Sequence, residues 1–156
     1  MKKTIAFILC LPYAMAYSGS SPFKYNESGE LPSGVEYSVE IKEVQYEKKS
    51  NELPDDGSMW GIDGGFCRYV VTIFNVKINN KPAYIYRKYY SDICDLTSVK
   101  VTEEKGQIIL IVSGGDGAGA FTAKYTFKRN KLTQRMVRMS EMPDDYWELI
   151  VMHHNL

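Results

Sequence analysis

The sequence predicts an all-β protein: a single antiparallel β-sandwich or small barrel of about seven or eight strands, with one disulfide. Three observations predict it. Short alternating or β-branched runs recur along the chain, separated by turn residues. No segment has the periodicity of an amphipathic helix. Two cysteines remain once an N-terminal export signal is set aside.

The export signal covers residues 1–16. Lys2 and Lys3 precede an apolar run, and Ala14 and Ala16 have the spacing that a signal peptidase requires. The run is shorter than the roughly 20 residues of a membrane-spanning helix. We therefore expect cleavage after Ala16 and a periplasmic or secreted product.

The rest of the chain is long enough for one domain and too short for two. We assign residues 17–34 to a flexible lead-in, because they are rich in Ser, Gly and Pro, and residues 35–156 to a single β-rich domain. The 19 basic and 19 acidic side chains balance, and the signal removes two lysines. No basic surface for nucleic acid is expected, and no membrane span after signal cleavage.

Cys67 and Cys94 form an even pair in an oxidising compartment, which favours a disulfide. Closing a loop of this size stabilises a fold by roughly 3–4 kcal/mol. The alternative is a pair of reduced thiols buried separately.

The first strands follow from alternation. Apolar positions alternate over residues 35–41 and then change phase, which predicts a strand with a bulge near Lys42 and Glu43. Residues 47–65 are polar and rich in Asp and Gly, as in a long loop. Residues 66–78 are β-branched and aromatic, and so predict the next strand.

The remaining elements form hairpins. Asn79 and Asn80 predict a two-residue turn into a return strand over residues 82–88. Residues 107–128 comprise an apolar run, a glycine loop and an alternating run, which predicts a hairpin at the centre of a sheet. Shorter strands are expected at 97–102 and 131–139; residues 146–152 fit either a strand or helical turns.

The glycine loop SGGDGAG is the first candidate binding site. It lacks the Gly-Lys-Ser/Thr of a phosphate-binding loop and leads into a strand. Its glycines serve either positive φ and close packing within the fold, or an open surface that a partner's backbone can approach. The candidate contact residues are Gly114, Gly115, Asp116, Gly117 and Gly119.

Aromatic residues are the second candidate. Trp60 lies inside the long loop, where it is either an interface anchor or a core residue. Tyr84 and Tyr86 belong to a tyrosine-rich run, and tyrosine offers a large contact area for protein or glycan binding.

Motifs for chemistry are weak. The aspartates match no EF-hand, His153 and His154 lack partners at metal-ligand spacing, and no Gly-x-Ser-x-Gly elbow occurs. We expect no metal, no cofactor and no catalytic residue.

The stretch GGDGAGAFTAKYTF, followed by Arg135 and then by EMPDDYWE at residues 141–148, resembles a pattern of small exported bacterial β-rich proteins of uncharacterised function. In architecture the chain is similar to periplasmic lysozyme inhibitors and immunity proteins. That resemblance implies a loop inserted into an enzyme's cleft, and SGGDGAG is the candidate.

The sequence thus favours a non-enzymatic periplasmic binding protein with a protein partner, most concretely an inhibitor or immunity protein against an enzyme that degrades the cell envelope. An envelope structural or assembly factor that uses an exposed sheet edge is the alternative, and a small periplasmic hydrolase is the second. The partner, the oligomeric state and the strand order do not follow from the sequence.

Overall fold

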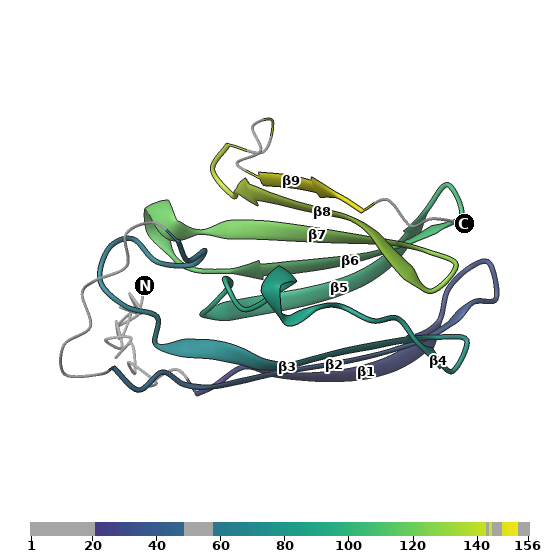
Figure 1. Cartoon of the computed structure of the whole chain (residues 1–156), viewed down its shortest axis with the longest axis horizontal. Helices are drawn as coiled ribbons and strands as arrows, with labels where there is room; N and C mark the ends of the chain where they lie inside the picture. The colour runs from purple at the N-terminus through teal and green to yellow at the C-terminus, as the bar shows by residue number, and fades with distance from the viewer. Residues whose placement is uncertain (1–20, 49–57, 143, 145–147, 153–156) are drawn as a thin grey trace, which may run out of the picture.

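The computed structural model describes residues 21–48, 58–142, 144 and 148–152. It shows two antiparallel sheets packed face to face as a sandwich (Figure 1). The first sheet has the order β1 (Lys24–Glu30), β2 (Glu36–Gln45), β3 (Tyr69–Ile78) and β4 (Lys81–Pro82). The second has the order β5 (Leu96–Glu104), β6 (Gln107–Gly114), β7 (Phe121–Lys128), β8 (Lys131–Met139) and β9 (Glu148–Val151).

Each sheet is a meander, in which every strand pairs with the strand before it in the chain. The predicted all-β class is confirmed, with a sandwich rather than a closed barrel. The described residues form nine strands instead of the expected seven or eight, and β4 has only two residues.

The core lies between the sheets. Alternate side chains of each strand point inward, as the two-residue repeat of a strand requires. Fully burying each such apolar side chain contributes about 1.5–3 kcal/mol. The largest inward residues are Ile41, Phe74 and Val76 in the first sheet and Leu110, Val112, Phe121, Tyr125 and Phe127 in the second.

Several expectations from the sequence are confirmed. The register of β2 against β3 shifts between Lys42 and Glu43, as the change of phase predicts. Asn79 and Asn80 both have positive φ in the turn between β3 and β4. The paired strands β6 and β7 form the expected hairpin inside the second sheet.

Two expectations need correction, and one open alternative is resolved. Residues 24–30, assigned to a flexible lead-in, form β1. Among the strands that the structure describes, this edge strand pairs with β2 alone, and it is mostly polar. The return strand at 82–88 ends at Pro82; residues 83–90 cross toward the second sheet and include the 3₁₀ helix η1 (Arg87–Tyr89). The last element, β9, is a strand.

Other expectations lie outside the described residues. These are the signal peptide over residues 1–16, the middle of the long loop, and His153 and His154. In the part of the chain that is described, no helix has the length and apolar character needed to cross a membrane.

Candidate functional site

The glycine loop packs against residues 61–63 of the same chain. A Cβ added to Gly119 would lie 2.5 Å from the carbonyl carbon of Ile62, and one on Gly115 would lie 2.8 Å from Gly61 Cα. Gly115 also has a φ of 72°, a backbone conformation that residues other than glycine rarely adopt. These glycines therefore allow two loops of this protein to meet backbone to backbone.

Of the two roles that the sequence left open for these glycines, close packing within the fold is the one that the contacts of Gly114, Gly115 and Gly119 support. Gly114 and Gly119 are buried, because the Phe121 ring lies against Gly114 and residues 61–63 cover Gly119. Gly115 is half-buried, whereas Asp116 and Gly117 are exposed. The surface that a partner can touch is reduced to the tip of the loop.

At this tip Asp116 pairs with Arg68. The Arg68 Nη2 lies 3.4 Å from an Asp116 carboxylate oxygen, and the aspartate side chain is 73% exposed. With Asp63, Phe66 and Asp95 they line a shallow hollow of about 270 Å³. An exposed ion pair contributes at most about 1 kcal/mol, so a partner can displace it at little cost.

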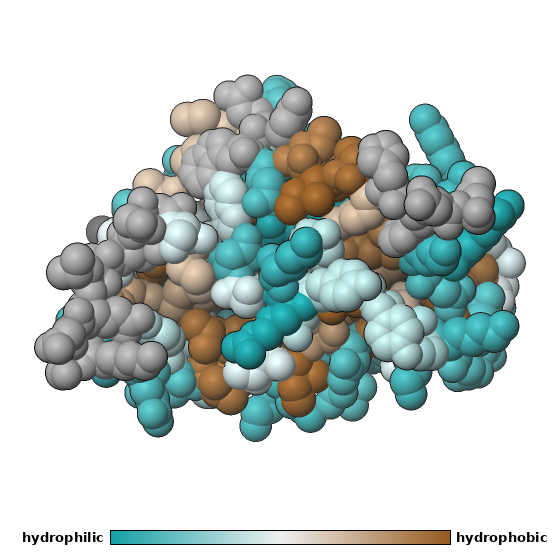
Figure 2. Space-filling view, viewed as in Figure 1, coloured by the Kyte–Doolittle hydropathy of each residue, from teal (hydrophilic) through white to brown (hydrophobic). Residues whose placement is uncertain are grey.

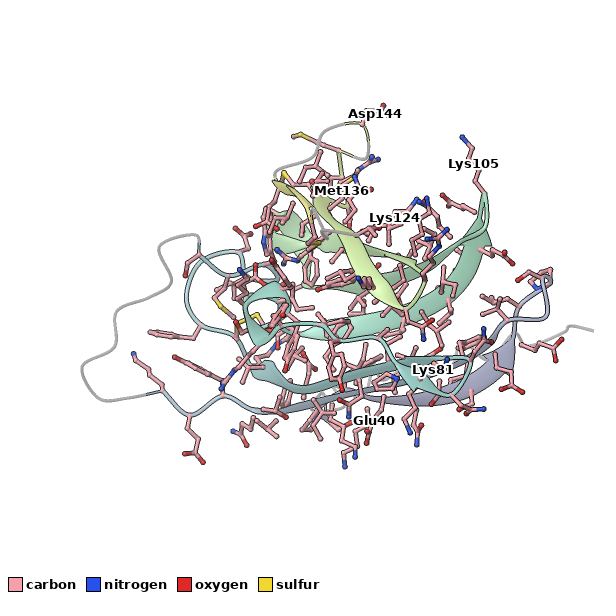
Figure 3. The ribbon with its side chains drawn as sticks, turned by 45° about the vertical axis from the view of Figure 1, so that its right-hand side comes forward. Glu40, Lys81, Lys105, Lys124, Met136 and Asp144 are labelled. Carbon is pink, nitrogen blue, oxygen red and sulfur yellow. A yellow bond between two sulfur atoms is a disulfide. The ribbon has the colours of Figure 1, made fainter. Side chains whose placement is uncertain are left out.

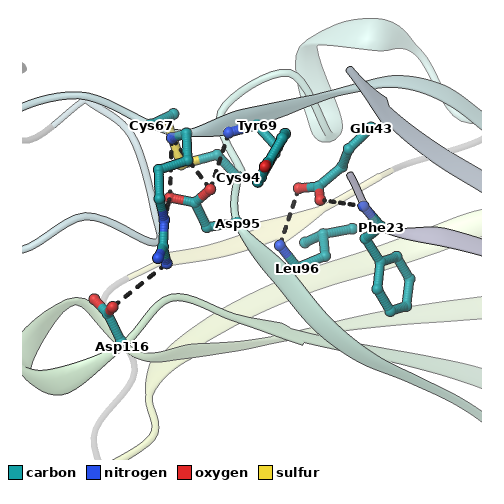
Figure 4. A network of polar contacts seen from close by, with 9 residues as sticks. Phe23, Glu43, Cys67, Tyr69, Cys94, Asp95, Leu96 and Asp116 are labelled. Atoms are coloured by element: carbon teal, nitrogen blue, oxygen red, sulfur yellow. Dashed lines mark hydrogen bonds and ion pairs between the residues drawn. A yellow bond between two sulfur atoms is a disulfide. The ribbon is translucent and has the colours of Figure 1, made fainter. Parts of the chain in front are cut away.

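The predicted disulfide is confirmed, and Figure 4 shows it beside Asp95, one of the residues that line this hollow. Next to Cys94, the buried Asp95 accepts hydrogen bonds from the backbone N–H groups of Tyr69, at 2.9 Å, and Arg68, at 3.1 Å. The Cys67–Cys94 bridge and Asp95 thus tie the start of β3 to the start of β5.

A second buried carboxylate, Glu43, was not anticipated as a site residue. Its side chain occupies the bulge of β2 and is 3% exposed. One oxygen accepts the N–H of Leu96 at 2.9 Å, and the other accepts the N–H of Phe23 at 3.2 Å (Figure 4). Glu43 therefore joins the N-terminal end of β1 to the second sheet.

Burial raises the pKa of Glu43 from its usual 4.5 to about 7, although the backbone hydrogen bonds act in the opposite direction. The neighbouring Asp95 carboxylate also raises it. A perturbed carboxyl is a typical signal of function. Here both oxygens are engaged by the backbone, and the role we assign to Glu43 is structural.

The raised pKa predicts a specific pH dependence. The folded state holds a proton that the unfolded state releases, so the contribution of Glu43 is complete below pH 4.5 and is lost as pH rises through about 7. The expected loss is about 3 kcal/mol. Urea unfolding at about pH 5 and about pH 8.5 measures it. In Glu43→Gln the difference in unfolding free energy between the two pH values should disappear. An unchanged difference would mean that another group causes it.

Trp60 is half-buried and packs against the core. Its backbone N–H donates to the backbone carbonyl of Asp92 at 2.7 Å, its own carbonyl accepts from the backbone N–H of Cys94 at 3.0 Å, and it forms a parallel bridge with Ile93. Of the two interpretations from the sequence, packing against the core is the one that these contacts support.

Tyr84 and Tyr86 belong to the segment 83–90, which we call the tyrosine strap. They are 78% and 70% exposed, whereas Ala83 between them and β4 is buried. The strap is held at both ends: Ala83 N–H donates to Val76 O at 2.8 Å, and the Tyr125 hydroxyl donates to Tyr89 O at 2.8 Å. The structure does not bring these two tyrosines into the glycine-loop hollow, which different residues line.

Beneath the end of the strap lies a buried arginine, Arg135, which belongs to the sequence pattern that carries the resemblance but to which no role was assigned. Arg135 of β8 is 0% exposed and donates from Nη2 to both oxygens of Asp92 at 2.8 Å, and from Nη1 to Glu148 of β9. Its position on the same strand face as Val137 was the other available signal. The partners come from distant segments, which no local pattern reveals.

Within the described ranges, no group of three His, Cys, Asp or Glu side chains is arranged to hold a metal ion. No family model, no curated protein and no solved structure matches this chain.

Proposed function

We propose that this chain is an exported, non-enzymatic binding protein that blocks an enzyme acting on the cell envelope. The observation that carries the proposal is the exposure of Tyr84 and Tyr86 on a strap whose backbone is fixed at both ends. Tyrosine loses little conformational entropy on binding, and a fixed backbone lowers the ordering cost further.

The exposed tip of the glycine loop is the second part of the proposed surface. Asp116 offers a carboxylate whose only partner among the contacts described is the exposed Arg68. A cationic group of the partner enzyme can replace Arg68 in this pair. The contact surface thus combines two aromatic anchors with one exchangeable charge.

The test is capture of periplasmic enzymes on the oxidised protein, followed by titration of the captured enzyme. Tyr84→Ala and Tyr86→Ala should each raise Kd about thirtyfold, the usual effect of removing an aromatic anchor. Asp116→Arg should also weaken the complex. Lys100→Ala, at an exposed position of β5, is the matched control. Unchanged affinity in both tyrosine variants would contradict the proposal.

The edge strand β9 favours a second candidate, an envelope assembly factor. Among the described strands β9 pairs with β8 alone, and its Leu149 and Val151 are exposed. An open edge of this kind can accept a strand from another chain. Self-association that is reduced by Leu149→Lys, without a one-to-one enzyme complex, would replace the first proposal with this one.

A further inference from the structure

The outer face of the first sheet carries polar side chains in two adjacent rows. One row consists of residues that pair with one another across three strands. The second row consists of the residues two positions away on each strand, because every second side chain of a strand lies on the same face. The first row is Asn26, Glu40 and Asn75, and the second is Ser28, Ser38 and Lys77. Figure 3 shows Glu40 projecting from this face, away from the second sheet.

These rows lead to the tyrosine strap. Lys77 pairs in register with Pro82, and Tyr84 follows two residues later. A groove of about 550 Å³ lies between the rows and the strap, with Tyr84 and Tyr90 on the strap side. Tyr90 is held by stacking on Phe74, with ring centroids 5.3 Å apart. In Figure 2 the strap region of the surface is pale to hydrophilic rather than strongly apolar.

The groove continues along the sheet. A second hollow of about 500 Å³ is lined by Ser28, Glu36 and Asn80, and shares Ser38 and Lys77 with the first. The shared residues make the two hollows neighbours. Together they form an elongated depression, which suits a chain-like ligand better than a compact one.

The polar groups in this depression are suited to hydroxyl-rich ligands. In the described part of the chain, Asn26, Ser38 and Lys77 have no side-chain hydrogen-bond partner. Glu40 is already engaged: it pairs with Lys42 and accepts a hydrogen bond from Asn75 Nδ2 at 3.0 Å, which fixes the Asn75 amide. An amide offers both donors and acceptors, a hydroxyl offers both, and the ammonium offers donors alone.

We propose that this depression binds an oligosaccharide. The apolar face of a sugar ring stacks on the exposed Tyr84 ring, and its hydroxyl groups bond Asn26, Asn75 and Ser38. Lys77, where the two hollows meet, interacts with a carboxylate of an acidic sugar. The proposal goes beyond the enzyme-binding function: the two surfaces share Tyr84, but Tyr86 does not line the groove.

The test uses the oxidised full chain, calorimetric titration and two probes: a tetrasaccharide of N-acetylglucosamine and one of galacturonic acid. Saturable binding of at least one probe is expected. Tyr84→Ala should weaken it about tenfold, and Tyr84→Phe should retain it because the ring is kept. Tyr86→Ala is the matched exposed-tyrosine control and should leave it unchanged. Lys77→Ala should weaken the acidic probe more than the neutral one.

Absence of binding for both probes at millimolar concentration would overturn the proposal. Equal weakening of binding by Tyr84→Ala and Tyr86→Ala would overturn the proposal as well. That result would mean that the sugar binds the exposed tyrosines of the strap and not the groove. The enzyme-binding proposal fails differently, since it predicts loss of a protein complex in both tyrosine variants. The two failures are therefore distinguishable.

Discussion

Arg135→Met is expected to lower the free energy of unfolding by about 3 kcal/mol. The substitution keeps most of the side-chain volume but removes the charge that faces two carboxylates. Asp92 and Glu148 would then lie against the core without their cation. Both are partly exposed, at 23% and 31% of their side chains. Hydration through those openings places the expected loss at the lower end of the range for broken buried ion pairs.

Urea unfolding of Arg135→Met measures this loss. Lys124→Ala is the matched control: Lys124 pairs with Glu104 at 2.8 Å on the exposed outer face of the second sheet, and its removal should cost less than 1 kcal/mol. Figure 3 shows Lys124 on that face. A similar loss in both variants would mean that the buried position of Arg135 contributes nothing beyond an ordinary surface pair.

Cys94→Ser is expected to cost about 3–4 kcal/mol, because the bridge closes a loop whose ends are 27 positions apart in the sequence. Without it the unfolded chain gains the conformational freedom of that whole loop. Cys94 is also fully buried, so the hydroxyl adds a further cost when it has no partner.

The comparison is unfolding of the oxidised protein, the reduced protein and Cys94→Ser under the same conditions. The reduced protein isolates the effect of the cross-link from that of the new hydroxyl. If reduction alone left the unfolding midpoint unchanged, the network of Asp95 with the N–H groups of Arg68 and Tyr69 would be sufficient to hold the two sheets together.

Alternation of side chains was enough to predict most of the fold. The face that a strand residue occupies is a local property, so the bulge at Lys42 and Glu43 and the hairpin over residues 107–128 could be read directly. β1 was not predicted from alternation, because an edge strand with one neighbour needs few apolar residues. The strap alternates like a strand, but past Ala83 the structure gives it no ladder partner; periodicity does not encode hydrogen-bond partners.

The candidate site was predicted less well, for a related reason. Exposure of Asp116 follows from its type and its position in the glycine loop, whereas Tyr84 and Tyr86 were expected on a return strand, whose outward face the sequence did not identify. The covering of Gly119 by residues 61–63 depends on which two loops meet in space. The pairing of Arg135 with Asp92 likewise depends on which distant segments come together. Such contacts join segments separated by tens of residues, and one sequence holds no local trace of them.

The two successive meanders have a consequence for how the chain reaches its native state. Within each sheet every strand after the first pairs with the strand before it, so the strand pairing of one sheet needs no strand of the other. Folding is slow chiefly when contacts join remote parts of the chain. For a protein delivered from its N-terminus, the first sheet has all its strands once Pro82 has emerged, before any strand of the second sheet is available.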